Sequence, residues 1–337
     1  MSERIKQERK RFEAWAESMP HEYPKKVSPK RSARLIDILD GRDVDMTRLE
    51  QTLADGNPNL PIVFLSFGAG VQSTVMLMLA IHDEIERPDH VLFSDTGWES
   101  EQTMRTVYWA QRQCEKAGIP FHIVGDRNIR DDNILAKSSG EGGYEGKGSG
   151  HWLSVPLFVD TEKGKGAQLR RQCTAEYKIT PLRKKQRELL GYKPRQRIKK
   201  GSSIVMIGIS TDEARRASQP RNAWQENIFP LIDPLKMSRS DCQAWWEKHY
   251  PSITIAKSGC VGCPYNSNKA WIDMKRNRPE EFKSAVEFDN SIRGATGSFG
   301  KGYIHRSMQP LGEIDFNDDQ GELSLDDAVY CAGGCGL

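Results

Sequence analysis

The sequence lacks the long apolar stretches that would place it in a membrane. Its longest apolar run is seven residues, Val75 to Ile81, whereas a helix that spans a bilayer needs about 20. The first residues are charged from Glu3 onward and include no apolar segment, so we expect no secretory signal. We therefore expect a cytoplasmic protein with no membrane partner.

The chain has few cysteines, and their number is odd; acidic and basic residues are nearly equal in number. Seven cysteines in a chain without an export signal argue against a disulfide framework, so cysteines that matter should bind metal or do chemistry. The net charge is only +3. Nucleic-acid binding would therefore have to come from local clusters of basic residues rather than from overall charge.

From residue 61 on, the pattern is that of an α/β protein. Short apolar, β-branched runs predict strands at Ile62–Leu65, His90–Ser94, Phe121–Val124 and Ile204–Ile209. Helical patterns lie between and after them, at Thr74–Ile85, Glu101–Ala117 and Thr174–Leu190. Strands and helices that alternate at this spacing predict a doubly wound, mainly parallel sheet.

The chain divides into three parts by composition. Residues 1–60 are polar and broken by proline, which predicts a helical and irregular extension that caps the rest. Residues 61–235 carry the nucleotide-binding pattern, and residues 236–337 predict a helical region that includes a CxxC and a mobile cysteine tail. Ser238 is placed to cap a helix there. The glycine-rich stretch at 140–150 is either a disordered surface loop or a lid over a ligand.

A glycine-containing turn joins the first strand to the first helix. Its two glycines would let backbone N–H groups turn inward, hydroxyl groups would add donors, and the helix N-terminus would supply a positive dipole end. It matches neither Walker A nor GxGxxG, so a tight turn without a ligand remains an alternative. The candidate phosphate-binding residues are Ser66, Gly68, Gly70, Gln72, Ser73 and Thr74.

Three segments occur in an order that resembles one known family. They are Ser66-Phe67-Gly68 through Gln72, then Asp95-Thr96-Gly97 with Glu99, then the ten residues Cys173–Leu182, with Cys260-Val261-Gly262-Cys263 following 87 residues after Cys173. They resemble the serine-rich loop, the D-T-G-x-E signature and the C-C-x-x-R-K-x-x-P-L segment with its distant CxxC in the phosphoadenylylsulfate (PAPS) reductase family. That family belongs to the PP-loop, or adenine nucleotide α-hydrolase-like, superfamily. The resemblance spans roughly residues 61–265 and implies an enzyme that binds ATP or PAPS.

The resemblance implies a [4Fe–4S] cluster, as in the iron–sulfur branch of the family. Its ligands would be Cys173, Cys260 and Cys263, while structural zinc on Cys260, Cys263 and two C-terminal cysteines is the alternative. Thr174 replaces the second cysteine of the tandem pair. One iron would then lack a protein thiolate unless a tail cysteine reaches it, and an open iron would suit sulfur transfer.

The C-terminal tail and one lysine are the catalytic candidates. Cys331 and Cys335 lie in a glycine-rich tail that resembles the family's terminal E-C-G-L-H, although Gly334 stands where glutamate is expected and no histidine follows Leu337. The two thiols could form and break a disulfide during turnover, or be incidental. Lys178, from the ten-residue match, is the third candidate. By contrast, Cys114 and Cys242 fall on helix faces typical of core residues.

Charged residues follow two of the expected strands. Glu213, Arg215 and Arg216 come after the strand at Ile204–Ile209, where sites in open α/β sheets form, and the arginines could clamp phosphate oxygens. A solvated helix start is the alternative. Asp95, after the second strand, could orient a ribose or bind Mg²⁺.

A basic run extends from Arg183 to Lys200, with nine basic residues against one acid, Glu188. It is either a solvated face or a rim at the mouth of the site. A basic rim would suit a polyanion such as tRNA or DNA.

These observations leave three hypotheses. In the leading one, ATP adenylates an acceptor with release of pyrophosphate, and sulfur then displaces AMP, the acceptor being a nucleobase or nucleic acid. In the second, the protein is a PAPS or adenylylsulfate reductase in which Cys335 attacks the sulfonate sulfur and thioredoxin resolves the adduct. The expected protein partner is thus either thioredoxin or a sulfur donor. The third is a zinc-stabilised nucleotide-binding protein without catalysis.

Overall fold

The computed structural model describes residues 61–140, 153–160, 166–294, 296 and 300–316. The helices expected in 1–60, the glycine-rich segment from residue 141 onward, and both tail cysteines lie outside the described residues. No described helix is both long enough and apolar enough to cross a bilayer.

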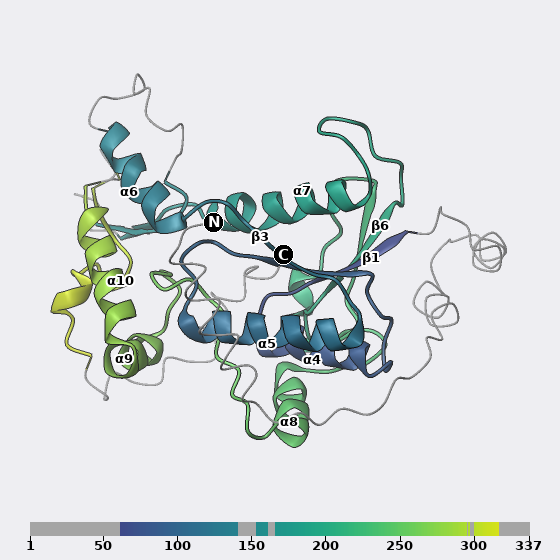
Figure 1. Ribbon diagram of the computed structural model, residues 1–337. Helices are drawn as coiled ribbons and strands as arrows, with labels where there is room; N and C mark the ends of the chain where they lie inside the picture. The colour runs from purple at the N-terminus through teal and green to yellow at the C-terminus, as the bar shows by residue number, and fades with distance from the viewer. Residues whose placement is uncertain (1–60, 141–152, 161–165, 295, 297–299, 317–337) are drawn as a thin grey trace, which may run out of the picture.

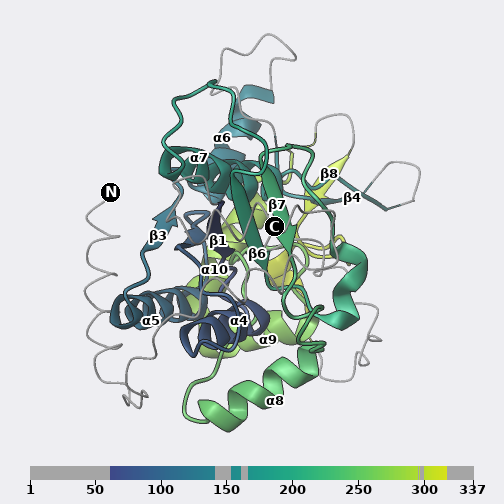
Figure 2. The same cartoon turned by 90° about the vertical axis from the view of Figure 1, so that its right-hand side faces the viewer.

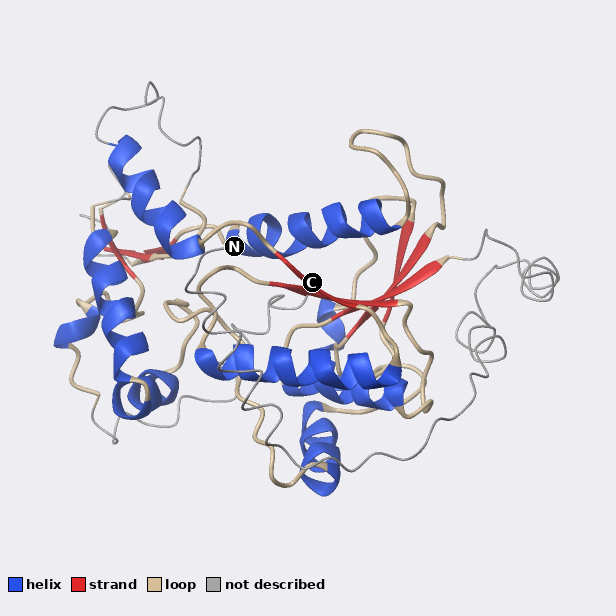
Figure 3. Ribbon diagram, in the orientation of Figure 1, coloured by secondary structure: helices blue, strands red, loops and turns tan. Residues whose placement is uncertain are grey.

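The centre of the protein is a five-stranded parallel sheet (Figures 1 and 3). Its strands are β1 (Ile62–Ser66), β2 (His90–Ser94), β3 (Phe121–Val124), β6 (Ser203–Ile207) and β7 (Gln225–Ile228). The spatial order is β3-β2-β1-β6-β7, so the chain reverses its direction of winding between β1 and β6. In open α/β sheets, ligands bind at such a switch point, outside the carboxyl ends of the strands.

Helices cover both faces of this sheet (Figure 1). On one face lie α4 (Val71–Ile81) and α5 (Glu101–Ala117), with α8 (Arg239–His249) packed against α4, as Figure 2 shows. On the other face lies α7 (Thr180–Leu189). Alternate residues of β1 serve the two faces: Val63 and Leu65 join the core under α4 and α5, whereas Phe64 joins the smaller core under α7.

A second apolar core lies beside the carboxyl edge of the sheet. It contains residues of α6 (Ile129–Gly140), α9 (Asn268–Asn277) and α10 (Pro279–Ser291), together with Leu157 and Ile304. A small antiparallel sheet borders it, in the order β5-β4-β8, with β4 at Phe158–Asp160, β5 at Ala167–Gln168 and β8 at Lys301–Tyr303. Short 3₁₀ helices lie at η3 (Thr211–Arg216) and η5 (Leu311–Glu313). Packing thus crosses the boundary expected at residue 235, since α6 packs with later helices and α8 with earlier ones.

The doubly wound, mainly parallel sheet predicted from the sequence is confirmed, with local differences. The helix expected at Thr74–Ile85 is α4, which begins at Val71 because Gly70 forms its N-cap, and ends at Ile81, before Asp83 adopts a left-handed φ of 59°. The helix expected at Thr174–Leu190 begins with six residues of π-helix, η2 (Thr174–Ile179). As expected, Ser238 caps α8, and it does so through a full capping box with Asp241.

The core positions expected for Cys114 and Cys242 are confirmed. Both side chains are fully buried within the core under α4, α5 and α8. Burial raises the pKa of the Cys114 thiol far above its ordinary range and that of Cys242 to about 12. Neither thiol is therefore available for chemistry at neutral pH.

Candidate functional site

The turn after β1 forms a cradle at the switch point. Ala69 has a left-handed φ of 58°, and Gly70 has an ordinary extended conformation with φ −93° and ψ 169°. The backbone conformation at position 70 is therefore one that residues other than glycine can also adopt. The first intrahelical bond of α4 runs from the Thr74 N–H to the Gly70 carbonyl, so the N–H groups of residues 71–73 make no such bond and can face an anion.

Two hydroxyls expected to bind phosphate are used within the cradle. The Ser73 hydroxyl accepts the Gly68 N–H at 3.2 Å and donates to the Gly70 carbonyl at 3.1 Å. The Thr74 hydroxyl donates to the same carbonyl at 2.8 Å and is fully buried. Both side chains hold the shape of the turn. Ser66, also expected there, is the last residue of β1 and is buried.

Gln72 connects the cradle to the loop after β6. Its Nε2 donates to Ser210 Oγ at 2.6 Å and to Glu213 Oε2 at 2.7 Å. Glu213 in turn pairs with Arg216 across 2.8 Å. Arg215 is exposed on the same turn. The structure thus brings Gln72, Glu213 and Arg216 together, as the position of the switch point requires, with Ser210 as an additional member.

Gly208 is the point of closest approach between these two loops. A Cβ added there would lie 2.9 Å from both Cα and N of Ser73, and 3.3 Å from the carbonyl carbon of Gln72. These are backbone atoms, which a side chain cannot displace cheaply. The residue that needs to be glycine is thus Gly208, whereas a Cβ on Gly70 would have only the Cβ of Ser258 nearby, at 3.9 Å.

Asp95 stabilises the turn that follows β2. Its Oδ1 accepts the Gly97 N–H at 2.7 Å. Gly125 packs directly against this turn, because a Cβ on it would lie 2.1 Å from the Asp95 carbonyl oxygen. Asp95 is only half-buried, so its carboxylate remains at the edge of the sheet, next to the cradle strand β1.

Cys260 lies in a polar contact group with residues from two other segments. Its Sγ is 3.2 Å from Thr96 Oγ1 and 3.8 Å from Glu99 Oε1, and Glu99 pairs with Lys178 across 3.6 Å. Burial raises the pKa of the Cys260 thiol well above its ordinary value, and the Glu99 carboxylate raises it further. In the absence of a metal ion, the Cys260 thiol beside the Glu99–Lys178 ion pair therefore ionises less readily than an ordinary thiol.

The expected metal ligands do not form a metal site in the part of the chain described. Cys173 and Cys260 both pack against the second apolar core, and the Cys263 N–H donates to the Cys260 carbonyl at 3.2 Å. Yet no three His, Cys, Asp or Glu side chains among the described residues are grouped to hold a metal ion. Cys173, Cys260 and Cys263 are therefore not gathered as a ligand set among the described residues, and the two tail cysteines lie outside them.

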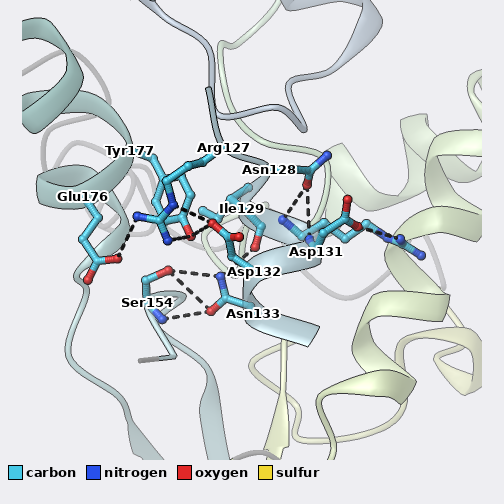
Figure 4. Close-up of polar contacts among 10 residues, drawn as sticks. Arg127, Asn128, Ile129, Asp131, Asp132, Asn133, Ser154, Glu176 and Tyr177 are labelled. Carbon is cyan, nitrogen blue, oxygen red and sulfur yellow. Dashed lines mark hydrogen bonds and ion pairs between the residues drawn. The ribbon is translucent and has the colours of Figure 1, made fainter. Parts of the chain in front are cut away.

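A second polar group, absent from the sequence-based prediction, anchors the π-helix (Figure 4). The Tyr177 hydroxyl donates to Asp132 Oδ2 at 2.7 Å and accepts from Arg127 at 2.9 Å, while Arg127 also pairs with Asp132 at 2.8 Å. The Tyr177 carbonyl accepts the Ser94 hydroxyl at 2.6 Å, at the end of β2. These contacts fix the backbone beside Lys178. No spacing in the sequence links them all, because Ser94, Arg127 with Asp132, and Tyr177 come from three separate segments.

The basic run is divided between the two edges of the sheet. Arg183 and Lys184 are exposed on the first half of α7, which follows the π-helix at the carboxyl edge. The loop 191–202 joins the end of α7 to the start of β6 and therefore lies at the amino edge, as Figure 1 shows at upper right. The expectation that the whole run lines the mouth of the site is wrong for this second half.

Comparison with known families identifies the domain. The phosphoadenosine phosphosulfate reductase domain family matches residues 62–234, from the start of β1 to Pro234 in the turn after β7. This chain belongs to that family. It is therefore an enzyme of the PAPS reductase family, whose members bind an adenine nucleotide substrate, PAPS. The match does not distinguish the iron–sulfur branch.

Among solved structures, this PAPS reductase family member is similar to phosphoadenylyl-sulfate reductase from Candida auris in its phosphate complex. The identity is 14%, with a TM-score of 0.34, over 67% of this chain and 89% of that one. A search of curated protein sequences finds no significant match.

Proposed function

We propose that this enzyme binds ATP across the switch point between β1 and β6 and uses it to activate an acceptor for sulfur transfer. The observation that carries the proposal is the connection from Gln72 to Ser210 and Glu213, with Arg216 attached at 2.8 Å. It joins the helix N-terminus of the cradle to a turn that carries two acidic and two basic side chains. Backbone N–H groups and a guanidinium that converge on one place are suited to a polyphosphate.

The proposed reaction has two steps. An acceptor oxygen attacks the α-phosphorus, forming a new P–O bond while the bond to the β-phosphate oxygen breaks and pyrophosphate leaves. A hydrosulfide ion then attacks the activated carbon, forming a C–S bond while AMP leaves with the acceptor's oxygen and the proton of the hydrosulfide is released. In this scheme Lys178 and Arg215 are proposed as cations near the developing charges, and Asp95 as a contact for the ribose or Mg²⁺.

A PAPS reductase is the second candidate, and the family match over residues 62–234 favours it. A thiolate, proposed to be Cys335, would attack the sulfonate sulfur of PAPS, forming an S–S bond as adenosine 3′,5′-bisphosphate leaves. A thioredoxin dithiol would then attack the cysteine sulfur, releasing sulfite and oxidising to a disulfide. Cys331 could replace one thioredoxin thiol in that step.

The first prediction separates the two candidates by their ligands. In titrations of the anaerobically purified full chain, we expect ATP to bind and PAPS and adenylylsulfate not to bind, with pyrophosphate released from ATP when tRNA or DNA is supplied. Binding of PAPS alone, with sulfite formed in the presence of thioredoxin, would establish the reductase instead. Stoichiometric iron with acid-labile sulfide would support the iron–sulfur branch of the family, whereas a single stoichiometric zinc would support a zinc-stabilised nucleotide-binding protein.

The second prediction concerns the acceptor, which we propose to be a nucleobase of tRNA or DNA. Reversing the charge of Arg183 and Lys184 to glutamate should weaken tRNA binding and flatten the slope of log affinity against log salt by about 1.4, since each lost single-strand phosphate contact contributes about 0.7. The matched control is the same reversal at Arg195 and Arg197, exposed in the loop at the amino edge. A larger effect from the control pair would place the polyanion away from the site.

A further inference from the structure

The Cβ of Ser258 lies beside the phosphate cradle. Its Cβ is the nearest heavy atom to the position that a Cβ of Gly70 would occupy, at 3.9 Å. Ser258 comes from the segment after α8, 188 residues after Gly70, so this approach is a tertiary contact that no local motif predicts. The cradle therefore has a wall that neither β1 nor β6 supplies.

The Ser258 hydroxyl oxygen is buried and forms no hydrogen bond with any other described residue. A buried hydroxyl without a partner costs about 1–3 kcal/mol, so such groups are uncommon unless a ligand completes them. Other hydroxyls of the cradle are used internally: those of Ser73 and Thr74 both donate to the Gly70 carbonyl. Ser258 is thus the hydroxyl at this place that remains available as a donor.

The segment that carries Ser258 is held firmly beyond it. Cys260 pairs with Glu99 in an isolated antiparallel bridge, and the Val261 N–H donates to the Trp98 carbonyl at 3.0 Å. Gly262 lies against the Trp98 ring so closely that a Cβ would be 2.2 Å from it. A donor on a segment fixed in this way is preorganised, and it binds with little loss of conformational entropy.

We propose that Ser258 is a phosphate-binding residue, whose hydroxyl donates to a phosphoryl oxygen of the nucleotide held by residues 67–73. The proposal rests on the proposed nucleotide site and adds a contact from outside the phosphate loop. It also places the phosphate chain on the same short segment as Cys260, two residues further on. Nucleotide and thiol would then meet along one stretch of backbone.

The test compares ligands with and without phosphate. Ser258→Ala should weaken ATP binding about 10- to 100-fold, the usual range for losing one hydrogen bond to a charged group, and should leave adenosine binding unchanged. Ser258→Thr keeps the hydroxyl and should restore most of the ATP affinity. The matched control is Ser252→Ala, an exposed serine on the same connection, which should bind both ligands as the wild type does.

A second variant addresses the same contact from the cradle side. Gly70→Ala is compatible with φ −93° and would bring a methyl group to 3.9 Å from the Ser258 Cβ, which is ordinary van der Waals contact, so the protein should fold. It should weaken ATP binding without affecting adenosine. Equal ATP affinity in the wild type and Ser258→Ala, or equal loss for ATP and adenosine, would overturn the role of Ser258. A wild type that binds neither ATP nor PAPS would instead overturn the nucleotide site itself.

Discussion

Gly208→Val is expected to lower nucleotide affinity by about 100-fold or more, since displacing a site's positioning atoms by about 1 Å can cost that much. The added side chain would meet the backbone of Ser73 at 2.9 Å, and the first turn of α4 would have to move away from β6. Gln72 would then lose its contacts with Ser210 and Glu213. Isothermal titration with ATP measures the effect, and overpacking should also cost about 1–3 kcal/mol of stability.

Another glycine provides a control for this result. A Cβ on Gly294 would have no atom within 4 Å, so Gly294→Val should bind nucleotide as the wild type does. If Gly208→Val retained full ATP affinity while remaining folded, the contact between the two loops would have no part in binding.

His305 is expected to make the folded state sensitive to acid. Burial, with a smaller contribution from the neighbouring Arg306, lowers its pKa to about 4. The hydrogen bonds agree with a neutral ring, because Nδ1 accepts the Ser307 N–H at 3.1 Å and Nε2 lies 3.0 Å from Asn268 Oδ1. A proton on Nδ1 would replace that acceptor with a donor.

The direction of the effect follows from proton linkage. Below pH 6.5 the unfolded chain binds a proton at His305 that the folded chain refuses until about pH 4, so stability falls as the pH falls through this window. Between pH 7 and pH 5 the loss should be about 2 kcal/mol in the free energy of unfolding. Urea titrations of His305→Gln should show a pH profile flatter by that amount, and the exposed His249→Gln should keep the wild-type profile. Identical profiles for His305→Gln and the wild type would contradict the assignment.

The sequence predicted the sheet well because each signal was local and strong. The predicted bounds of β2, β3 and α5 agree with the structure. For α5, Ser100 supplies a side-chain cap and Gly118 a left-handed end, both readable in advance. The strand expected at Ile204–Ile209 stops at Ile207, because Gly208 leaves the ladder to pack against Ser73. That contact is tertiary, and no periodicity records it.

The candidate site was predictable only where it depends on residues that directly follow the parallel strands. Gln72 and Glu213 were both singled out, and the adjacency of β1 and β6 explains why residues 141 apart hydrogen-bond. Ser258 and the contacts among Arg127, Asp132 and Tyr177 were missed, since each depends on what lies opposite in space. The sequence also could not predict that the Ser73 and Thr74 hydroxyls bond to the turn itself. The side-chain rotamer decides whether such a hydroxyl bonds to the turn or to a ligand.

The π-helix at Thr174–Ile179 has a consequence for which changes this chain can accept. The Thr180 N–H bonds to the Ala175 carbonyl, five residues back instead of four, so the segment contains one residue more than a regular helix would need. Substitution of exposed Ala175 leaves that count unchanged. Deletion of a single residue would restore four-residue spacing and turn everything upstream by about 100° around the helix axis, carrying Cys173 away from the core that it shares with Cys260. In this segment, deletion of one residue is therefore expected to disturb the structure more than substitution of an exposed residue such as Ala175.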